Sequence, residues 1–166
     1  MDRSLRTVSG RGRRILLSTV SSDSHTWNLV HLQLLLEEQG NEVVNLGPCV
    51  PDQLLLDTVR RVRPDAVVIS TVNGHGHLDG ARVARMLRAD PSTRHVPLMI
   101  GGKLGTAGAR NERYAQALVD AGFDAVFTDA GDPALLNRCL PPLPAGGADG
   151  IAEVEGSGSD TEGVAA

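Results

Sequence analysis

The sequence contains few aromatic residues, only two cysteines and no long apolar segment. Phe, Trp and Tyr make up 2% of its 166 residues, so a core must consist of Leu, Val, Ile and Ala. No apolar run approaches the ~20 residues of a membrane-spanning helix. Cys49 and Cys139 lack the spacing of a metal-binding pair. These absences favour a soluble protein of a reducing compartment, the cytoplasm, without a membrane partner.

The sequence also lacks an excess of one charge over most of its length. The net charge is −4, but the acidic excess lies in residues 141–166, and residues 1–14 are rich in Arg. No basic stripe of the kind that binds nucleic acid is present, and the N-terminus lacks the apolar core of a signal peptide. We expect a flexible basic N-terminus (1–13), one folded domain (14–140) and a disordered acidic tail (141–166).

Apolar runs and helical patterns alternate five times along the folded segment. Strands are expected at 14–20, 41–47, 66–71, 97–100 and 125–128, and helices at 27–39, 51–63, 79–88, 111–121 and 132–139. This alternation predicts an α/β fold with a doubly wound, five-stranded parallel sheet. Five units of this size favour the flavodoxin-like strand order 2-1-3-4-5, a Rossmann-like arrangement.

The strand order predicts where a ligand would bind. Such sheets bind ligands at the carboxyl ends of the strands, where the order reverses, and here that point lies between the first and third strands. The loops after the first, third and fourth strands contain Asp23 and His25, residues 70–77, and residues 101–108. Six glycines in the last two loops either leave room for a ligand or form tight turns.

Asp23 and His25 have the spacing of a metal-ligand pair. The His can offer one ring nitrogen to a metal while the Asp holds the proton of the other nitrogen and raises the basicity of the ligand. The alternative is that both are ordinary surface residues of a loop. His25, His75 and His77 could also form a three-His metal site, although a polar lining or surface role fits His75 and His77 better.

Motifs of other nucleotide and phosphate sites are missing. No G-x-G-x-x-G follows the first strand, no G-x-x-x-x-G-K-[ST] occurs, and no flavin-type phosphate cradle is present. Receiver domains share the expected fold, and Lys103 is compatible with one. Residues 70–73 contain no Asp that could be phosphorylated, which argues against a receiver.

The three loops together resemble the cobalamin-binding domain family. That family has D-x-H-x-x-G after the first strand, S-x-L after the third and G-G after the fourth. The corresponding residues here are Asp23-Ser24-His25-Thr26-Trp27-Asn28, Ser70-Thr71-Val72 and Gly101-Gly102. The resemblance extends over residues 14–138, and within the family the chain is similar to the small subunits of glutamate mutases (methylaspartate mutases).

The resemblance implies a role for each motif in binding cobalamin. His25 would displace the dimethylbenzimidazole of the cofactor and become the lower axial ligand of cobalt, with Asp23 bonded to its far nitrogen. Ser70 would hydrogen-bond near the base of the displaced nucleotide tail. The expected cofactor-binding residues are Ser22, Asp23, Ser24, His25, Thr26, Ser70, Thr71, Val72, Gly101, Gly102, Lys103, Leu104, Gly105 and Thr106.

The chain departs from the family pattern at Asn28, where the family has Gly. The Gly lets the nucleotide tail pass close to the start of the first helix. Asn can cap a helix and tolerates positive φ, but it adds a side chain beside the bulky Trp27. We therefore expect weakened cofactor binding or a re-routed tail.

The resemblance also implies an activity that needs a partner. Adenosylcobalamin would supply radical chemistry that interconverts L-glutamate and threo-3-methylaspartate. The substrate would lie in a separate barrel subunit, because 166 residues cannot also hold a barrel of ~250 residues. The expected assembly is a heterotetramer in which this chain is not catalytic alone and contributes no acid or base.

Two other classes of function stay open. A methyl-carrying corrinoid protein usually has a helical module before this domain, and only residues 1–13 precede the first strand here. A non-catalytic cobalamin sensor or interaction module is favoured by Asn28 and by the acidic tail. Sensors commonly add a DNA-binding or light-responsive region, for which the sequence has no space.

Overall fold

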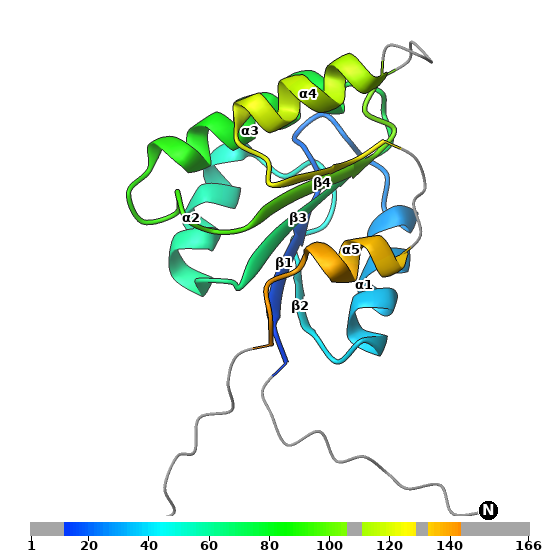
Figure 1. Cartoon of the computed structure of the whole chain (residues 1–166), viewed down its shortest axis with the longest axis vertical. Coiled ribbons are helices and arrows are strands. Elements are labelled where there is room, and N and C mark those ends of the chain that lie inside the picture. The colour runs from blue at the N-terminus through cyan, green and yellow to red at the C-terminus, as the bar shows by residue number, and fades with distance from the viewer. Residues whose placement is uncertain (1–11, 106–110, 129–132, 144–166) are drawn as a thin grey trace, which may run out of the picture.

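The computed structural model describes residues 12–105, 111–128 and 133–143. Strands and helices alternate in it, and the strands form one parallel sheet of order β2-β1-β3-β4-β5 (Figure 1). The elements are β1 (Arg14–Ser18), α1 (Trp27–Glu38), β2 (Glu42–Asn45), α2 (Asp52–Val62), β3 (Ala66–Thr71), α3 (Gly76–Ala89), β4 (Leu98–Gly102), α4 (Asn111–Ala121), β5 (Ala125–Phe127) and α5 (Pro133–Cys139). The predicted fold and strand order are confirmed.

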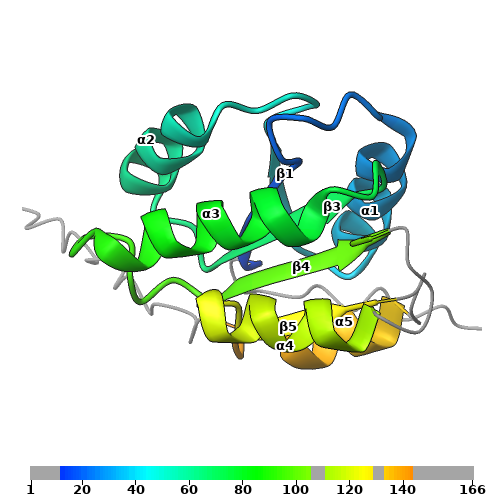
Figure 2. The same ribbon diagram turned by 90° about the horizontal axis from the view of Figure 1, so that it is seen from above.

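Helices cover both faces of the sheet and bury two separate cores. α2, α3 and α4 pack on one face, and α1 and α5 pack on the other. Seen from above, α1 and α2 lie on opposite sides of β1 (Figure 2). In β3, Val67 and Ile69 point into the first core, whereas Ala66 and Val68 point into the second. A strand buried on both faces therefore reads as a continuous apolar run.

The second helix ends where the sequence predicts. Arg63 caps α2 in the left-handed conformation with φ of 49°, and Pro64 follows it directly. Proline disfavours a helical conformation of the residue before it. This break returns the chain to the sheet at Ala66.

The third helix begins three residues earlier than predicted. α3 starts at Gly76 instead of Asp79, so His77 lies in its first turn and not in a loop. The His77 backbone N–H donates to the Leu104 carbonyl oxygen at 3.0 Å, a contact between segments that local sequence does not reveal. A side chain at Gly76 would also clash, because its Cβ would lie 2.4 Å from Thr71 Cγ2.

The fourth strand extends two residues further than predicted. Ser70 and Thr71 of β3 pair with Gly101 and Gly102 of β4. The two glycines therefore belong to the sheet, and the loop after β4 begins at Lys103. Pairing with a long neighbouring strand holds these glycines in the sheet despite their low strand propensity.

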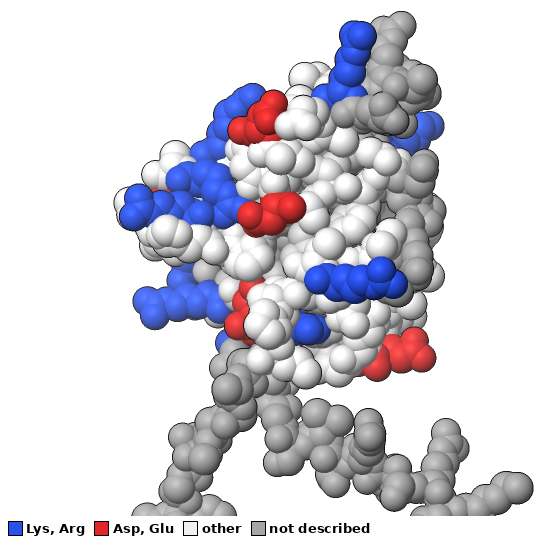
Figure 3. Space-filling view, in the orientation of Figure 1, with Lys and Arg blue, Asp and Glu red and all other residues white. Residues whose placement is uncertain are grey.

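Charges of both signs are interspersed on the surface. Arg60 pairs with Asp57 at 3.1 Å, and Arg82 pairs with Asp79 at 2.6 Å. On the face shown in Figure 3, basic and acidic residues lie close together along one edge, and much of the face is uncharged. This face differs from the continuous basic stripe of nucleic-acid-binding domains. Among the described residues, no helix combines the length and apolar character needed to cross a membrane.

The two ends of the described chain meet beside β1. The Arg13 guanidinium donates to the Pro141 carbonyl oxygen, and to Asn137 Oδ1 at 3.2 Å. Most of the predicted flexible N-terminus and acidic tail, residues 1–11 and 144–166, lies outside the described residues.

Candidate functional site

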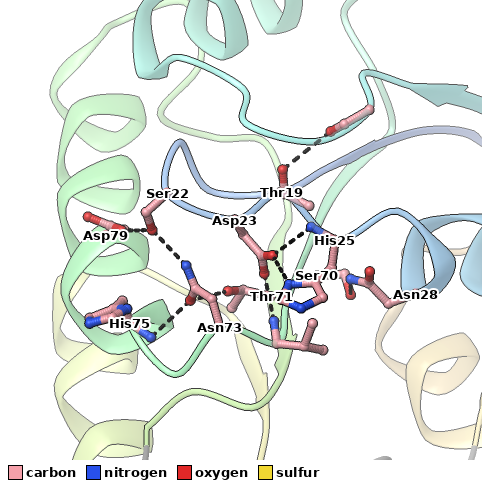
Figure 4. Close-up of polar contacts among 12 residues, drawn as sticks. Thr19, Ser22, Asp23, His25, Asn28, Ser70, Thr71, Asn73, His75 and Asp79 are labelled. Atoms are coloured by element: carbon pink, nitrogen blue, oxygen red, sulfur yellow. Dashed lines mark hydrogen bonds and ion pairs between the residues drawn. The ribbon is translucent and has the colours of Figure 1, made fainter.

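Polar side chains gather at the carboxyl edge of the sheet, between β1 and β3. Figure 4 shows Asp23 and His25 from the loop after β1 beside Ser70 and Thr71 at the end of β3. Asn28, in the first turn of α1, lies next to them. This edge is the point at which the strand order reverses, where the sequence places the site.

Asp23 is fully buried and binds both loops. Its Oδ1 accepts the backbone N–H of His25 at 3.0 Å and contacts His25 Nδ1 at 2.7 Å, and its Oδ2 accepts the Val72 N–H at 2.7 Å. The contact between Asp23 and His25 was predicted from their spacing together with the resemblance to the family. The contact with Val72 was not, because the two residues lie far apart in the sequence. Asp23 therefore fixes the His25 ring and also joins the β1 loop to β3.

The surroundings of Asp23 keep it ionised. Burial alone would raise its pKa, but hydrogen bonds from the backbone N–H groups of His25 and Val72 and from the His25 ring outweigh burial and lower the pKa. An ionised carboxylate only accepts hydrogen bonds, so Nδ1 of His25 is the donor. A neutral His25 then has a free lone pair on Nε2. Because the His25 side chain is 48% exposed, this nitrogen is open to a metal or ligand.

Asn28 forms a buried polar pair with Ser70. Its Nδ2 donates to Ser70 Oγ at 2.7 Å, and only 5% of the residue is exposed. Its Oδ1 is buried and has no hydrogen-bond partner in the described part of the chain. A buried acceptor without a partner is uncommon in folded proteins and marks a place where a ligand or water can donate. The sequence identified Asn28 as a departure from the family but not its contact with Ser70.

At the end of β4, Gly102 is required by the packing of the chain itself, whereas a side chain at Gly101 would make a tight contact. Gly102 has φ of +111°, and a Cβ there would lie 2.1 Å from the Thr71 carbonyl oxygen. A Cβ at Gly101 would lie 3.2 Å from Phe127 Cβ. That these glycines also leave room for a nucleotide tail stays a prediction.

The other predicted cofactor-binding residues differ in their exposure. Thr71, Val72, Leu104 and Gly105 are buried or half-buried, and Ser22, Ser24, Thr26 and Lys103 are exposed. Thr26 also lines a groove of about 540 Å³ beside α1, with Leu29, Val30, Gln33, Asn45, Leu46, Gly47 and Pro48. Thr106 lies outside the described residues.

A second polar cluster joins the same loops to α3. Ser22 Oγ accepts from Asn73 Nδ2 at 2.8 Å and donates to Asp79. Burial alone would raise the pKa of Asp79, but the bonds from Ser22 and Arg82 lower it. Sequence reasoning did not identify Asn73 or Asp79 as partners of Ser22. The only available signal was the position of Asn73 in the loop after β3.

His75 and His77 do not join His25. The His77 ring stacks on Tyr114 with 3.9 Å between ring centroids, and its Nδ1 contacts the Leu104 carbonyl oxygen at 2.8 Å. Over the described ranges, no three His, Cys, Asp or Glu residues are placed to hold a metal ion. The site there offers a single candidate metal ligand, His25, supported by Asp23.

Comparison with known proteins finds relatives over most of the chain. The family model described as B12 binding domain matches residues 13–135. The glutamate mutase sigma subunit of Halobacterium salinarum is 30% identical over 124 residues, covering 73% of this chain and 80% of that protein. That of Fusobacterium nucleatum is 26% identical over 115 residues, covering 69% of this chain and 84% of that protein.

A solved structure is also similar. A cobalamin-binding protein from Desulfitobacterium hafniense has a TM-score of 0.64 and 27% identity, and the match covers 79% of this chain and 60% of that one. This chain thus spans about three fifths of that protein.

Proposed function

The chain belongs to the B12-binding domain family, and on that premise we propose that it is the adenosylcobalamin-binding small subunit of a carbon-skeleton mutase. Glutamate mutase is the best supported, because the relatives of similar length carry that name. The observation that carries the proposal is the buried Asp23 bonded to a half-exposed His25. Such an imidazole would be able to ligate the cobalt of a corrinoid in place of the cofactor's own base.

The donor groups at the carboxyl edge fit a corrinoid. His25 has a free Nε2 on a ring that Asp23 holds in place, and a carboxylate behind a ligating His raises its basicity. Beside it, Asn28 has a buried acceptor without a partner next to the Ser70 hydroxyl. These two groups lie on the sheet face covered by α1, where the resemblance predicts the nucleotide tail.

The residues of this chain would bind and orient the cofactor. His25 would be the axial ligand, Asp23 would hold its ring, and Ser70 and Asn28 would contact the tail. Bound adenosylcobalamin would supply a cobalt–carbon bond that breaks homolytically to start radical chemistry. No side chain here is assigned a proton transfer with the substrate, which would lie in a separate barrel subunit.

Two exposed apolar side chains support a partner at the same edge. Trp27 is 65% exposed and Leu78 is 63% exposed, and they lie in the first turns of α1 and α3. Both turns face the carboxyl edge of the sheet, on either side of the loop that contains His25. A subunit that covers a corrin on His25 would also cover these side chains.

A cobalamin sensor or interaction module is the second candidate. The observation in its favour is that Asn28 already occupies the hydroxyl of Ser70, the group expected to contact the tail. If the Asn28 side chain leaves no room for the nucleotide tail beside Ser70, the cofactor cannot bind with its base displaced.

An absorption spectrum with adenosylcobalamin, with and without a candidate barrel subunit, tests the proposal. We expect a base-off, His-on spectrum for the wild type and for the control His31→Ala, because His31 is exposed on α1 away from the site. His25→Ala should lose this spectrum and the coupled mutase activity. A His-on spectrum or full activity in His25→Ala would refute the axial role. No binding even with the barrel subunit would favour an interaction module.

A further inference from the structure

We propose that Asn28 and Ser70 together select the base at the end of the cofactor's nucleotide tail. The pair favours a base with an N–H donor beside a ring-nitrogen acceptor, such as a 6-aminopurine, over dimethylbenzimidazole. This inference rests on the proposed function, since it requires a corrinoid bound with its base displaced from cobalt.

The hydrogen bonds of the pair define what a ligand must offer. Asn28 Nδ2 donates to Ser70 Oγ at 2.7 Å, so the Ser70 hydroxyl still has its own hydrogen to donate. Asn28 Oδ1 is buried and accepts from no described residue. The pair therefore presents one donor and one acceptor. In the opposite orientation of the amide, the Ser70 hydroxyl would donate to Asn28 Oδ1. Nδ2 would then be the donor offered to the ligand and Ser70 Oγ the acceptor, so the pair would again present one of each.

The position of the pair matches the expected path of the tail. Val68, two residues before Ser70, packs in the core beneath α1 and α5, so Ser70 faces the same side of the sheet. Gly101 pairs with Ser70 in β4 and adds no side chain there. Asn28 approaches from the first turn of α1, at the position where the family pattern has Gly. The hydrogen-bonding group is thus an addition of this chain to a shared location.

The two kinds of base differ in what they offer this pair. Dimethylbenzimidazole, joined to its ribose through one ring nitrogen, retains one acceptor nitrogen and has no N–H. It can accept from Ser70 but leaves the Asn28 acceptor buried and unpaired. A 6-aminopurine has an amino donor next to a ring-nitrogen acceptor and satisfies both, as Asn does with adenine elsewhere. Because Asn28 Oδ1 is already buried without a described partner, a base that donates to it should bind about tenfold or more tightly than one that does not.

Titration with two cobamides that differ only in their base, adenine or dimethylbenzimidazole, tests the selection. Cobinamide, which lacks the tail, serves as a third ligand, and the corrinoid spectrum reports binding without reference to mutase activity. We expect the wild type to bind the adenine form about tenfold to a hundredfold more tightly. Cobinamide affinity should not change among the Asn28 variants, which shows that each variant is folded and that His25 is competent.

Two variants separate hydrogen bonding from shape. Asn28→Gly restores the family residue, and Asn28→Leu keeps nearly the same size without polar atoms. Both should reduce the preference to within about threefold, because the buried acceptor is removed. Gln116→Ala, an amide deletion at an exposed position of α4, should keep the full preference.

Each outcome decides between the alternatives. Equal binding of the two cobamides by the wild type would overturn base selection while leaving the proposed function intact. A preference for the adenine form that persists in Asn28→Leu would overturn the hydrogen-bonding basis. If the Asn28 variants bind both cobamides more weakly by the same factor, Asn28 contacts the ribose and base selection is also overturned. If neither cobamide nor cobinamide binds, the proposed function fails together with the selection.

Discussion

At the scale of the residue, Asp23 is the side chain on which the site depends. Its Oδ1 contacts the backbone N–H and the ring Nδ1 of His25, and its Oδ2 accepts the Val72 N–H. In Asp23→Asn, either the Val72 N–H or the His25 donors would face an amide N–H₂ group. We expect a loss of about 2 kcal/mol in the free energy of unfolding, because a buried donor is left unpaired. Cofactor affinity should fall by ~10–100-fold, as for other groups behind a metal ligand.

Urea denaturation at pH 7 and cofactor titration measure these two losses. Asp57→Asn is the matched control, because Asp57 is exposed on α2 and its partners among the described residues, Gln53 and Arg60, are exposed side chains of the same helix. It should change the free energy of unfolding by less than about 0.5 kcal/mol. Equal effects of the two substitutions would contradict the structural role of Asp23.

The pKa of Asp23 also predicts how its contribution depends on pH. The pKa is lowered in the folded state, so the stabilisation is complete above the unfolded value of ~3.9 and is lost as pH falls through the lower folded value. The stability difference between wild type and Asp23→Asn should therefore be constant near neutral pH and shrink below about pH 4. Denaturation series from pH 7 downward test this, and a difference that grows in acid would contradict it.

The local pattern in the sequence suggested the bond between Asp23 and His25 but left an ordinary surface loop open, and the strand order and the resemblance to the family favoured the bond. The local pattern did not predict the hydrogen bond from the Val72 N–H to Asp23, nor the bond between Asn28 and Ser70. Those partners are brought together only when β1 and α1 pack against β3. Contacts of this kind depend on the folded arrangement of distant segments.

At the scale of the element, apolar runs and breakers predicted the strands and their order. The five strands are at the predicted places because each apolar run is long enough to cross a buried sheet. The predicted start of α3 and the predicted end of β4 were wrong, because both boundaries depend on partners in another segment. His77 donates to Leu104, and Gly102 pairs with Thr71.

Gly102 should be the glycine least tolerant of a side chain at this edge. Gly102→Ala would combine a positive φ with a Cβ 2.1 Å from the backbone of Thr71. We expect a loss of more than about 2 kcal/mol in the free energy of unfolding. Gly47→Ala is the control, because Gly47 has φ of +80° but open space around its Cβ position. It should cost about 1 kcal/mol from φ alone; equal losses in urea denaturation would show that the close contact relaxes.

At the scale of the whole molecule, the contact between the two described ends predicts what a trimmed chain needs. Residues 12–143 contain both cores and the bonds from Arg13 to Pro141 and Asn137. This segment should retain cofactor binding and a stability within about 0.5 kcal/mol of the full chain. A chain of residues 12–140 lacks the Pro141 acceptor and should lose about 1 kcal/mol more. A large loss of cofactor binding by residues 12–143 would show that residues outside this segment contribute to the site.

The proposed assembly makes a prediction about α1. Trp27, Val30 and Leu34 are exposed along one face of this helix. A partner that covers the corrin on His25 would bury Trp27, in the first turn. Leu34 lies two helical turns away from the carboxyl edge. Trp27→Ala should therefore weaken binding of the barrel subunit by about tenfold or more, as for other buried Trp anchors.

Leu34→Ala provides the comparison, because it removes an equally exposed apolar side chain from the same helix. It should leave the affinity for the barrel subunit within about threefold of wild type. Leu34→Ala should also keep the wild-type affinity for the cofactor in the absence of the partner, because Leu34 lies two helical turns from the carboxyl edge. If Leu34→Ala weakens assembly more than Trp27→Ala, the partner covers the length of α1 instead of the carboxyl edge, and the docking of a barrel over His25 is wrong.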